Sequence, residues 1–177
     1  IFDDFTSGKS VELAWINPDD GLLVIDANDS GTVDQLKEFV FTEWSVYATT
    51  DAEAIAEVFD TNQDYVLDSQ DELFEQFKIW KDANTDGISD EGELQPLSHH
   101  FIESINLSYR DSSEIATAAD GDVQIYGQMD VQFSDGTTGL AEDTGFKKGD
   151  LKAIYDPLTS SGGDINLDRE ESEAGAV

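Results

Sequence analysis

Cysteine is absent from the 177-residue chain, and basic residues are scarce. Without cysteine, the chain forms neither disulfides nor thiolate metal sites. Only 9 Lys and Arg stand against 40 Asp and Glu, which gives a formal net charge of −31. A charge of this sign and size excludes nucleic acids and anionic membrane surfaces as partners, because both are polyanions.

Long apolar runs and a leader sequence are also missing. The apolar stretch 21–25 is far too short to span a bilayer, so we expect no membrane insertion. The chain opens with neither Met nor a signal peptide, and we expect a monomeric domain cut from a longer protein. Its 38% hydrophobic and 10% aromatic residues exclude an acidic disordered chain and are sufficient for one real core.

The segment 82–93, DANTDGISDEGE, crowds five carboxylates and an Asn into twelve residues. Such crowding is unfavourable unless a cation binds among them. This is the pattern of the EF-hand calcium loop. Such a loop has oxygen ligands on alternate residues, a Gly at loop position 6, a carbonyl ligand at position 7 and a Glu at position 12. The predicted ligands of this third loop are Asp82, Asn84, Asp86, the carbonyl of Ile88, and Glu93.

A second loop, residues 60–71, repeats the pattern with two departures. Tyr65 replaces the usual Gly at position 6, which costs some backbone strain. Asp71 replaces the Glu at position 12 and, being shorter, is expected to bind through one oxygen only. The predicted ligands are Asp60, Asn62, Asp64, the carbonyl of Val66, and Asp71.

A first loop, residues 26–38, lies upstream. Lys37 occupies position 12 and Glu38 follows it, so closure has to come from position 13. The alternatives are a ligand shell open to water or to an outside carboxylate, or a plain Asx and Gly turn without metal. The predicted ligands are Asp26, Asn28, Ser30, Thr32, Asp34 and Glu38.

Two other features carry weaker signals. The run 164–170, DINLDRE, has the first three oxygens but an Arg at position 6, and a solvated acidic tail explains it equally well. His99 and His100 are adjacent, but no further transition-metal ligands stand near them, and we expect a surface loop there.

The chain has two kinds of periodicity. Residues 50–59 open with a capping box, Thr50 and Glu53, and predict a helix; residues 69–80 predict a second helix that buries Phe77 and Trp80. Alternation of apolar and polar residues predicts strands over 101–107 and 123–133, with a hairpin turn at 134–137.

We therefore expect an α+β fold, with EF-hand-like calcium loops and short helices packed on an antiparallel β-sheet. One domain is expected over 1–155, with a linker or tail over 156–177.

Three or more Ca²⁺ ions would change the energetics of such a chain. At about 100 times the dissociation constant each site adds ~2.7 kcal/mol, so three sites add about 8 kcal/mol. The total stability of a domain is only ~5–15 kcal/mol, so we expect calcium to be a condition of folding. Because calcium is plentiful outside cells, we expect an extracellular location.

The order of these motifs resembles a module of bacterial repeats-in-toxin (RTX) proteins. The resemblance rests on the run from Trp15 to Asp26, the three loops, the segment 79–89, the strand end Leu107-Ser-Tyr109 and the run 135–138, and it spans 11–151. It implies one of two functions: self-processing, in which an Asp-Pro bond ahead of the module is cleaved, or calcium-dependent binding of protein C-termini by an adhesin. This chain opens with Ile-Phe-Asp-Asp-Phe-Thr and has no Pro there, and its one Asp-Pro bond, Asp156–Pro157, lies in the expected tail.

We therefore expect a peptide-binding module of a large secreted RTX adhesin rather than an enzyme. It would hold carboxylates of peptide or protein C-termini on host or neighbouring cells through bound calcium, at the bacterial cell surface. Trp44 and Tyr47, just after the first loop, are the candidate contacts for a peptide side chain, with core packing as the alternative reading. Self-processing and a passive calcium-rigidified spacer remain the alternatives.

Overall fold

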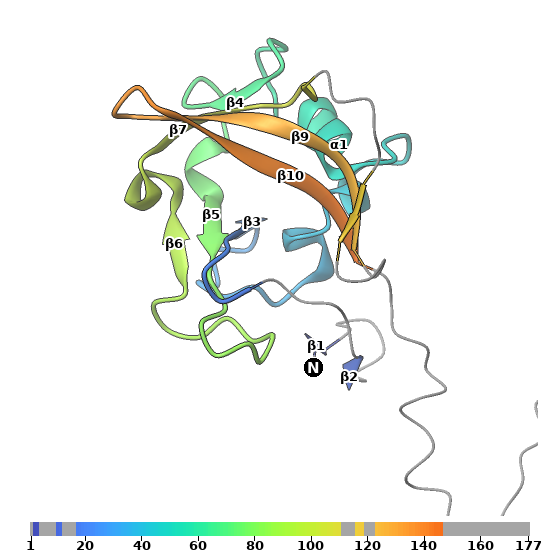
Figure 1. The fold of residues 1–177 in the computed structure, drawn as a ribbon, viewed down its shortest axis with the longest axis vertical. Helices are drawn as coiled ribbons and strands as arrows, with labels where there is room; N and C mark the ends of the chain where they lie inside the picture. The colour runs from blue at the N-terminus through green and yellow to red at the C-terminus, as the bar shows by residue number, and fades with distance from the viewer. Residues whose placement is uncertain (1, 4–9, 12–16, 111–115, 119–122, 147–177) are drawn as a thin grey trace, which may run out of the picture.

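The computed structural model describes residues 2–3, 10–11, 17–110, 116–118 and 123–146, and it is mostly β-sheet (Figure 1). One α-helix, α1 (Asp51–Val58), accompanies four short 3₁₀ helices in this part of the chain. The 3₁₀ helices are η1 (Leu36–Glu38), η2 (Phe41–Trp44), η3 (Phe74–Gln76) and η4 (Leu97–His100).

The strands form three antiparallel sheets. A two-stranded ribbon joins β1 (Phe2–Asp3) to β2 (Ser10–Val11). A three-stranded sheet has the order β3 (Leu22–Ile25), β5 (Phe77–Trp80), β6 (Leu94–Pro96). A five-stranded sheet has the order β10 (Thr138–Phe146), β9 (Val123–Phe133), β7 (Ile102–Asn106), β4 (Val66–Asp68), and β8 (Ala116–Ala118) also pairs with β9.

The β9–β10 hairpin forms the long arm of the five-stranded sheet and crosses in front of α1 in Figure 1. Its turn at 134–137 is tight because Gly136 adopts a φ of 84°, a conformation that costs glycine little. The predicted strands over 101–107 and 123–133 and the predicted hairpin turn are confirmed.

The main core lies between the five-stranded and the three-stranded sheets. Leu67 and Ile105 pair across β4 and β7, and both side chains are buried. From the other sheet, Phe77 meets Phe41 and Phe59 with ring centroids 5.7 and 5.3 Å apart. Aromatic contacts of this kind stabilise beyond the area that they bury, so these rings hold η2 and the end of α1 against the three-stranded sheet.

The three-stranded sheet is buried on its second face as well. Successive side chains of a strand point to opposite faces, so Ile25 enters the main core while Val24 enters a smaller cluster. That cluster contains Val24, Val33 and Trp80, with relative exposures of 0%, 6% and 0%. Leu22 and Leu94 pack against its edge.

Helix α1 begins as its sequence predicts. Thr50 is the N-cap, and its hydroxyl accepts a hydrogen bond from the Glu53 amide at 3.3 Å. Glu53 reaches back to the amide of Thr49 at 2.8 Å, which holds the pKa of its carboxyl below the usual value. The first contact satisfies an amide that the first helical turn leaves without a partner, and the second ties the residue before the N-cap to the helix. The predicted helix over 50–59 is confirmed.

The structure contradicts the predicted α+β fold with EF-hand-like helical loops. Only the second loop follows an α-helix, and no described loop leads into one; strands and 3₁₀ turns flank the others. The predicted helix over 69–80 is wrong, because Asp71 is bonded within the second loop and Phe77–Trp80 pair as strand β5 with both neighbours. Tertiary pairing overrides the helical spacing of Phe77 and Trp80.

No helix in the described residues is long and apolar enough to cross a membrane. The expected tail over 156–177, its Asp156–Pro157 bond, the run 164–170 and Trp15 lie outside the described residues.

Candidate metal centres

Each predicted loop begins where a buried element ends. The first residues, Asp26, Asp60 and Asp82, follow β3, α1 and β5, and their relative exposures are 7%, 5% and 0%. A buried carboxylate needs hydrogen-bond donors or a cation beside it. The elements thus fix the start of all three loops in the protein interior, while most of the other loop residues remain exposed.

The first carboxylate of each loop holds the backbone in the same way. Its two oxygens accept hydrogen bonds from the amides of loop residues 5 and 6, at distances between 2.8 and 3.2 Å. These bonds fold the chain back over Asp26, Asp60 and Asp82. Residues 4 and 6 of each loop accordingly have positive φ values, between 57° and 77°.

The third and fifth residues continue the pattern. The side-chain oxygens of Asn28, Asn62 and Asn84 accept from the amide of residue 5 at 3.0 to 3.2 Å. The side chain of residue 5 accepts from the amide of residue 7 at 2.9 Å in the second and third loops and 3.3 Å in the first. The side-chain oxygens of residues 1, 3 and 5 therefore lie on the inner side of one tight turn.

The last carboxylate closes each loop with the same two backbone contacts. In the third loop Glu93 accepts from the amides of residues 2 and 9 at 2.9 and 3.1 Å. In the second loop Asp71 makes both contacts, at 2.8 and 3.0 Å. In the first loop Glu38 makes them at 3.2 and 2.8 Å, although it stands one position later. In the first loop, position 13 thus takes the structural place that position 12 has in the other two loops.

The Asn at position 3 of each loop also donates to a carboxylate of the same loop. The amide nitrogen of Asn84 donates to Asp86 and to Asp90, both at 3.0 Å. Asn28 donates to Asp34 at 3.0 Å, and Asn62 donates to Asp64 at 2.9 Å. A positively polarised amide group therefore contacts one carboxylate in the first and second loops and two in the third, at positions where the charges favour a cation.

The donor set fits a hard divalent cation. All predicted ligands are carboxylate, amide, hydroxyl or backbone carbonyl oxygens, which calcium prefers. In the first loop the Ser30 hydroxyl lies 3.1 Å from the Thr32 carbonyl, so two predicted ligands are already adjacent. No three His, Cys, Asp or Glu side chains of the described residues gather closely enough to hold a metal by themselves. The fit accordingly depends on amide, hydroxyl and carbonyl oxygens as well as on carboxylates.

Residues 1–147 match the family model of the SPM domain. The chain belongs to the SPM domain family. It is also similar to the iron-regulated protein FrpA of Neisseria meningitidis serogroup C, with 31% identity over 179 residues. That match covers 98% of this chain and 15% of FrpA, so the SPM domain corresponds to a small part of its relative. The similarity to FrpA supports, at a coarse level only, a relation of this SPM domain to RTX-type proteins.

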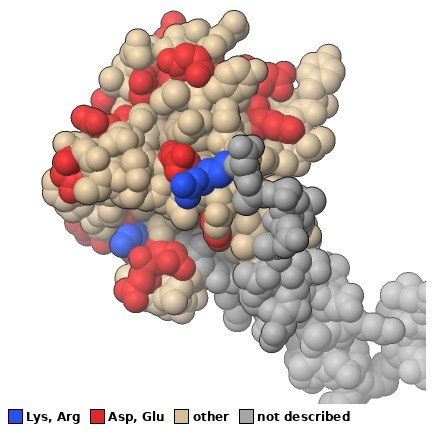
Figure 2. All heavy atoms as spheres, turned by 45° about the horizontal axis from the view of Figure 1, so that its top comes forward, with Lys and Arg blue, Asp and Glu red and all other residues tan. Residues whose placement is uncertain are grey.

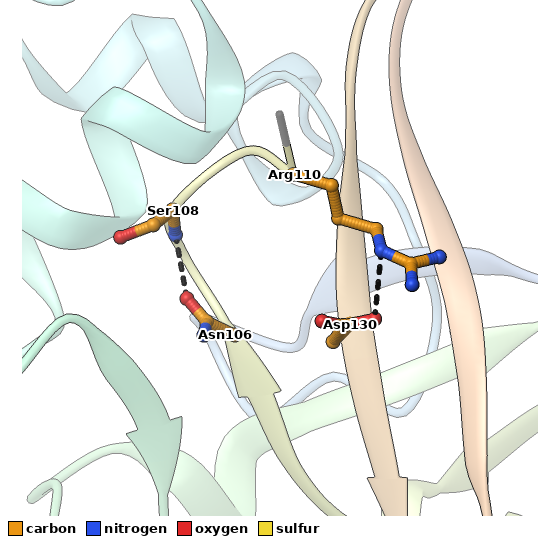
Figure 3. Close-up of polar contacts among 4 residues, drawn as sticks. All are labelled: Asn106, Ser108, Arg110 and Asp130. Atoms are coloured by element: carbon orange, nitrogen blue, oxygen red, sulfur yellow. Dashed lines mark hydrogen bonds and ion pairs between the residues drawn. The ribbon is translucent and has the colours of Figure 1, made fainter. Parts of the chain in front are cut away.

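The SPM domain carries little positive charge to balance its acids. Figure 2 shows Asp and Glu over much of the visible face and few Lys and Arg. Within the described residues, one ion pair joins Arg110 and Asp130 at 3.3 Å, on the outer face of β9 (Figure 3). Both side chains are half-exposed, so this pair contributes little to stability. The buried Asp26, Glu38 and Asp60 pair with no Lys or Arg in the described part of the chain.

Trp44 and Tyr47, the candidate peptide contacts, point to different environments. The Trp44 ring packs on Phe59 with centroids 5.3 Å apart, and its indole donates to the Lys37 carbonyl at 2.7 Å. The Lys37 ammonium lies 4.7 Å from the Trp44 ring centroid, a cation–π contact. Tyr47 is 82% exposed beside Val46, which is 89% exposed. Trp44 thus belongs to the core edge, whereas Tyr47 is open to solvent.

Sequence reasoning missed a polar cluster at the start of α1. The buried Asp143 of β10 accepts from the Ala52 amide at 2.8 Å and from the Tyr109 hydroxyl at 2.6 Å. Burial, followed by the hydrogen bond to Asp143, raises the pKa of Tyr109 above its ordinary value. Burial and the nearby Asp143 charge also raise the pKa of Asp51 from 3.8 to about 6. The strand pattern of residues 138–146 contained no signal that an inward Asp would reach a helix start.

Proposed function

We propose that this SPM domain is a calcium-stabilised module of a long RTX-type protein and that it binds peptide carboxylates through calcium. The supporting observation is the hydrogen-bond pattern that three separate loops share, which places oxygen donors of the kind that calcium prefers inside each turn. Bound calcium would supply positive charge at sites where carboxylates crowd in a chain of net charge −31.

The residues that would hold the ions are those of the three loops. They would supply side-chain oxygens at positions 1, 3 and 5 and the carbonyl of position 7, together with the carboxylate that closes each loop. In the first loop these residues are Asp26, Asn28, Ser30, Thr32, Asp34 and Glu38; in the second, Asp60, Asn62, Asp64, Val66 and Asp71; in the third, Asp82, Asn84, Asp86, Ile88 and Glu93.

Bound calcium would allow this acidic domain to bind carboxylates. A cation with a coordination position facing solvent attracts an anionic group that the surrounding acids otherwise repel. The free C-terminus of a peptide or of a protein on a target cell is such a group. Calcium is abundant outside cells, so we propose that the module acts at the bacterial surface, in attachment to host or neighbouring cells.

Peptide titration tests this function. A library of peptides with free C-termini and its amidated counterpart are titrated into the domain, in calcium and in excess chelator. We expect binding only for free carboxylates and only with calcium, and weaker binding for Asp86→Ala, with the exposed Glu75→Gln as a charge-matched control. Calcium could instead stabilise the fold while neither calcium nor amidation changes the affinity for any peptide. In that case the module is a spacer, and the proposed peptide binding is wrong.

Self-processing is the second candidate, because the sequence resemblance over residues 11–151 implies either function and the SPM match covers most of that range. The domain is expressed with the sequence that precedes it, incubated with calcium and separated on a denaturing gel. Fragments that end in Asp at an Asp-Pro bond would favour self-processing. A single intact band, with peptide binding retained, would favour the binding function.

A further inference from the structure

The first and third loops contact each other directly. The Val33 amide donates a hydrogen bond of 2.7 Å to the Ser89 hydroxyl, across 56 residues of sequence. Val33 and Ser89 are the eighth residues of their loops, and their relative exposures are 6% and 8%. A buried amide that loses its acceptor is costly, so each loop constrains the middle of the other.

A shared apolar cluster strengthens this contact. The Val33 side chain packs with Trp80 and Val24 on the outer face of the three-stranded sheet. The Trp80 indole donates to the closing carboxylate of the third loop, Glu93, at 3.4 Å. A residue from the middle of the first loop thus packs against the side chain that contacts the end of the third.

The second loop lies elsewhere. Its eighth residue, Leu67, is fully buried in the main core and pairs with Ile105 of β7. Its backbone therefore continues into the five-stranded sheet and does not enter the small cluster of Val24, Val33 and Trp80. The domain contains one pair of loops in mutual contact and one loop supported by a sheet.

We infer that the first and third loops bind cations cooperatively, whereas the second loop binds independently; this inference rests on the calcium binding proposed above. A cation that orders one loop fixes the Val33–Ser89 contact and the packing around Trp80. The partner loop then loses less conformational freedom when its own cation binds, which is positive coupling. By thermodynamic linkage, each site raises the affinity of the other by the same factor.

Calcium titrations followed by NMR test the inference loop by loop. The backbone amides of residue 6, Gly31, Tyr65 and Gly87, report on the first, second and third loops. Asp86→Ala removes one exposed carboxylate from the third loop, and Asp64→Ala removes the equivalent carboxylate from the second. Because both variants lose the same charge at the same loop position, they differ mainly in which loop is disabled.

We expect Asp86→Ala to weaken calcium binding at Gly31 by about fivefold or more, the lower end of usual allosteric coupling. Asp64→Ala should change it by less than about twofold. Ser89→Ala, which retains every predicted ligand, should also reduce the coupling, and Ser89→Thr should restore it. Equal effects of the two Asp variants at Gly31 would overturn the coupling and leave calcium binding intact. No calcium response at any reporter would instead overturn the proposed function.

Discussion

At the scale of single residues, the closing carboxylate connects the start of each loop to its ninth residue. Glu38 is fully buried, and its two oxygens accept hydrogen bonds from three backbone amides of the first loop. The side-chain length and register differ among Glu38, Asp71 and Glu93, but the backbone contacts are the same. The loop therefore needs a carboxylate at a given point in space and tolerates a shift of one residue in sequence.

We expect Glu38→Gln to lower the free energy of unfolding by about 3 kcal/mol, because an amide nitrogen replaces one acceptor and leaves buried amides unsatisfied. Urea unfolding in saturating calcium measures the loss. The exposed Glu43→Gln is the matched control and should change stability by less than about 0.5 kcal/mol. A similar, small effect of both changes would show that Glu38 does not close the first loop.

The sixth loop residues provide a reciprocal test of backbone strain. Gly31 has a φ of 77° and Tyr65, at the same position of the second loop, has a φ of 63°. A Cβ at Gly31 would meet no atom within 4 Å, so the cost of Gly31→Ala is conformational only. We expect Gly31→Ala to destabilise by about 1 kcal/mol and Tyr65→Gly to stabilise by up to about 1 kcal/mol. Changes of the same sign in thermal unfolding would contradict this assignment.

The three turns of the candidate site could be predicted from residue types alone. The spacing of Asp, Asn and Gly located all three turns, since alternate oxygen donors and a positive φ at residue 6 are local properties of the chain. The contact between Val33 and Ser89 could not be predicted, because it joins two loops that meet only after the strands have paired. The placement of Trp44 at the core edge depends on Phe59 in the same way.

At the scale of elements, the start of α1 is sensitive to pH. The folded-state pKa of Asp51 is raised from 3.8 to about 6, so its ionised form destabilises the fold. This penalty is complete above about pH 6 and vanishes below about pH 4, so stability from this group falls as pH rises. We expect Asp51→Asn to add about 1–2 kcal/mol near pH 7.5 and nothing near pH 4. Urea titrations across this range measure it, with Glu75→Gln as the control; a pH-independent difference would contradict the assignment.

The segment after β7 is held to the sheet by Tyr109, whose ring lies against Gly127 of β9. A side chain at Gly127 would displace this ring and break its hydrogen bonds to Asp143 and Thr50. We expect Gly127→Val to cost about 3 kcal/mol, a large effect for a strand substitution that otherwise favours β-structure. Tyr109→Phe, which keeps the ring, should cost only about 1–2 kcal/mol. If urea unfolding shows no loss for Gly127→Val, Tyr109 does not anchor this segment.

The long alternating strands and the capped helix could be predicted, because their patterns are unambiguous over eight or more residues. The segment 69–80 could not, since its five apolar residues fit either a helix or a buried strand. Pairing with both β3 and β6 decides in favour of strand β5. The predicted α+β fold class is wrong for the same reason, because strands of three or four residues are recognised only through the strands that they pair with.

At the scale of the whole molecule, the net negative charge lowers the stability of the folded state. A charge of −31 destabilises a compact state through self-repulsion, and the described Lys and Arg residues neutralise little of it. Three divalent cations would cancel about six of these charges where the carboxylates are most crowded. Calcium would therefore act on the whole fold, including the small cluster around Trp80.

Thermal unfolding followed by circular dichroism, in millimolar calcium and in excess chelator, tests this claim most directly. We expect chelation to lower the melting temperature by about 20 °C or more, as the loss of three sites worth about 8 kcal/mol implies for a chain of this size. Magnesium at the same concentration should restore little, because it prefers a smaller, octahedral oxygen shell. Melting curves that coincide with and without calcium would contradict the claim that these loops are cation sites on which the fold depends.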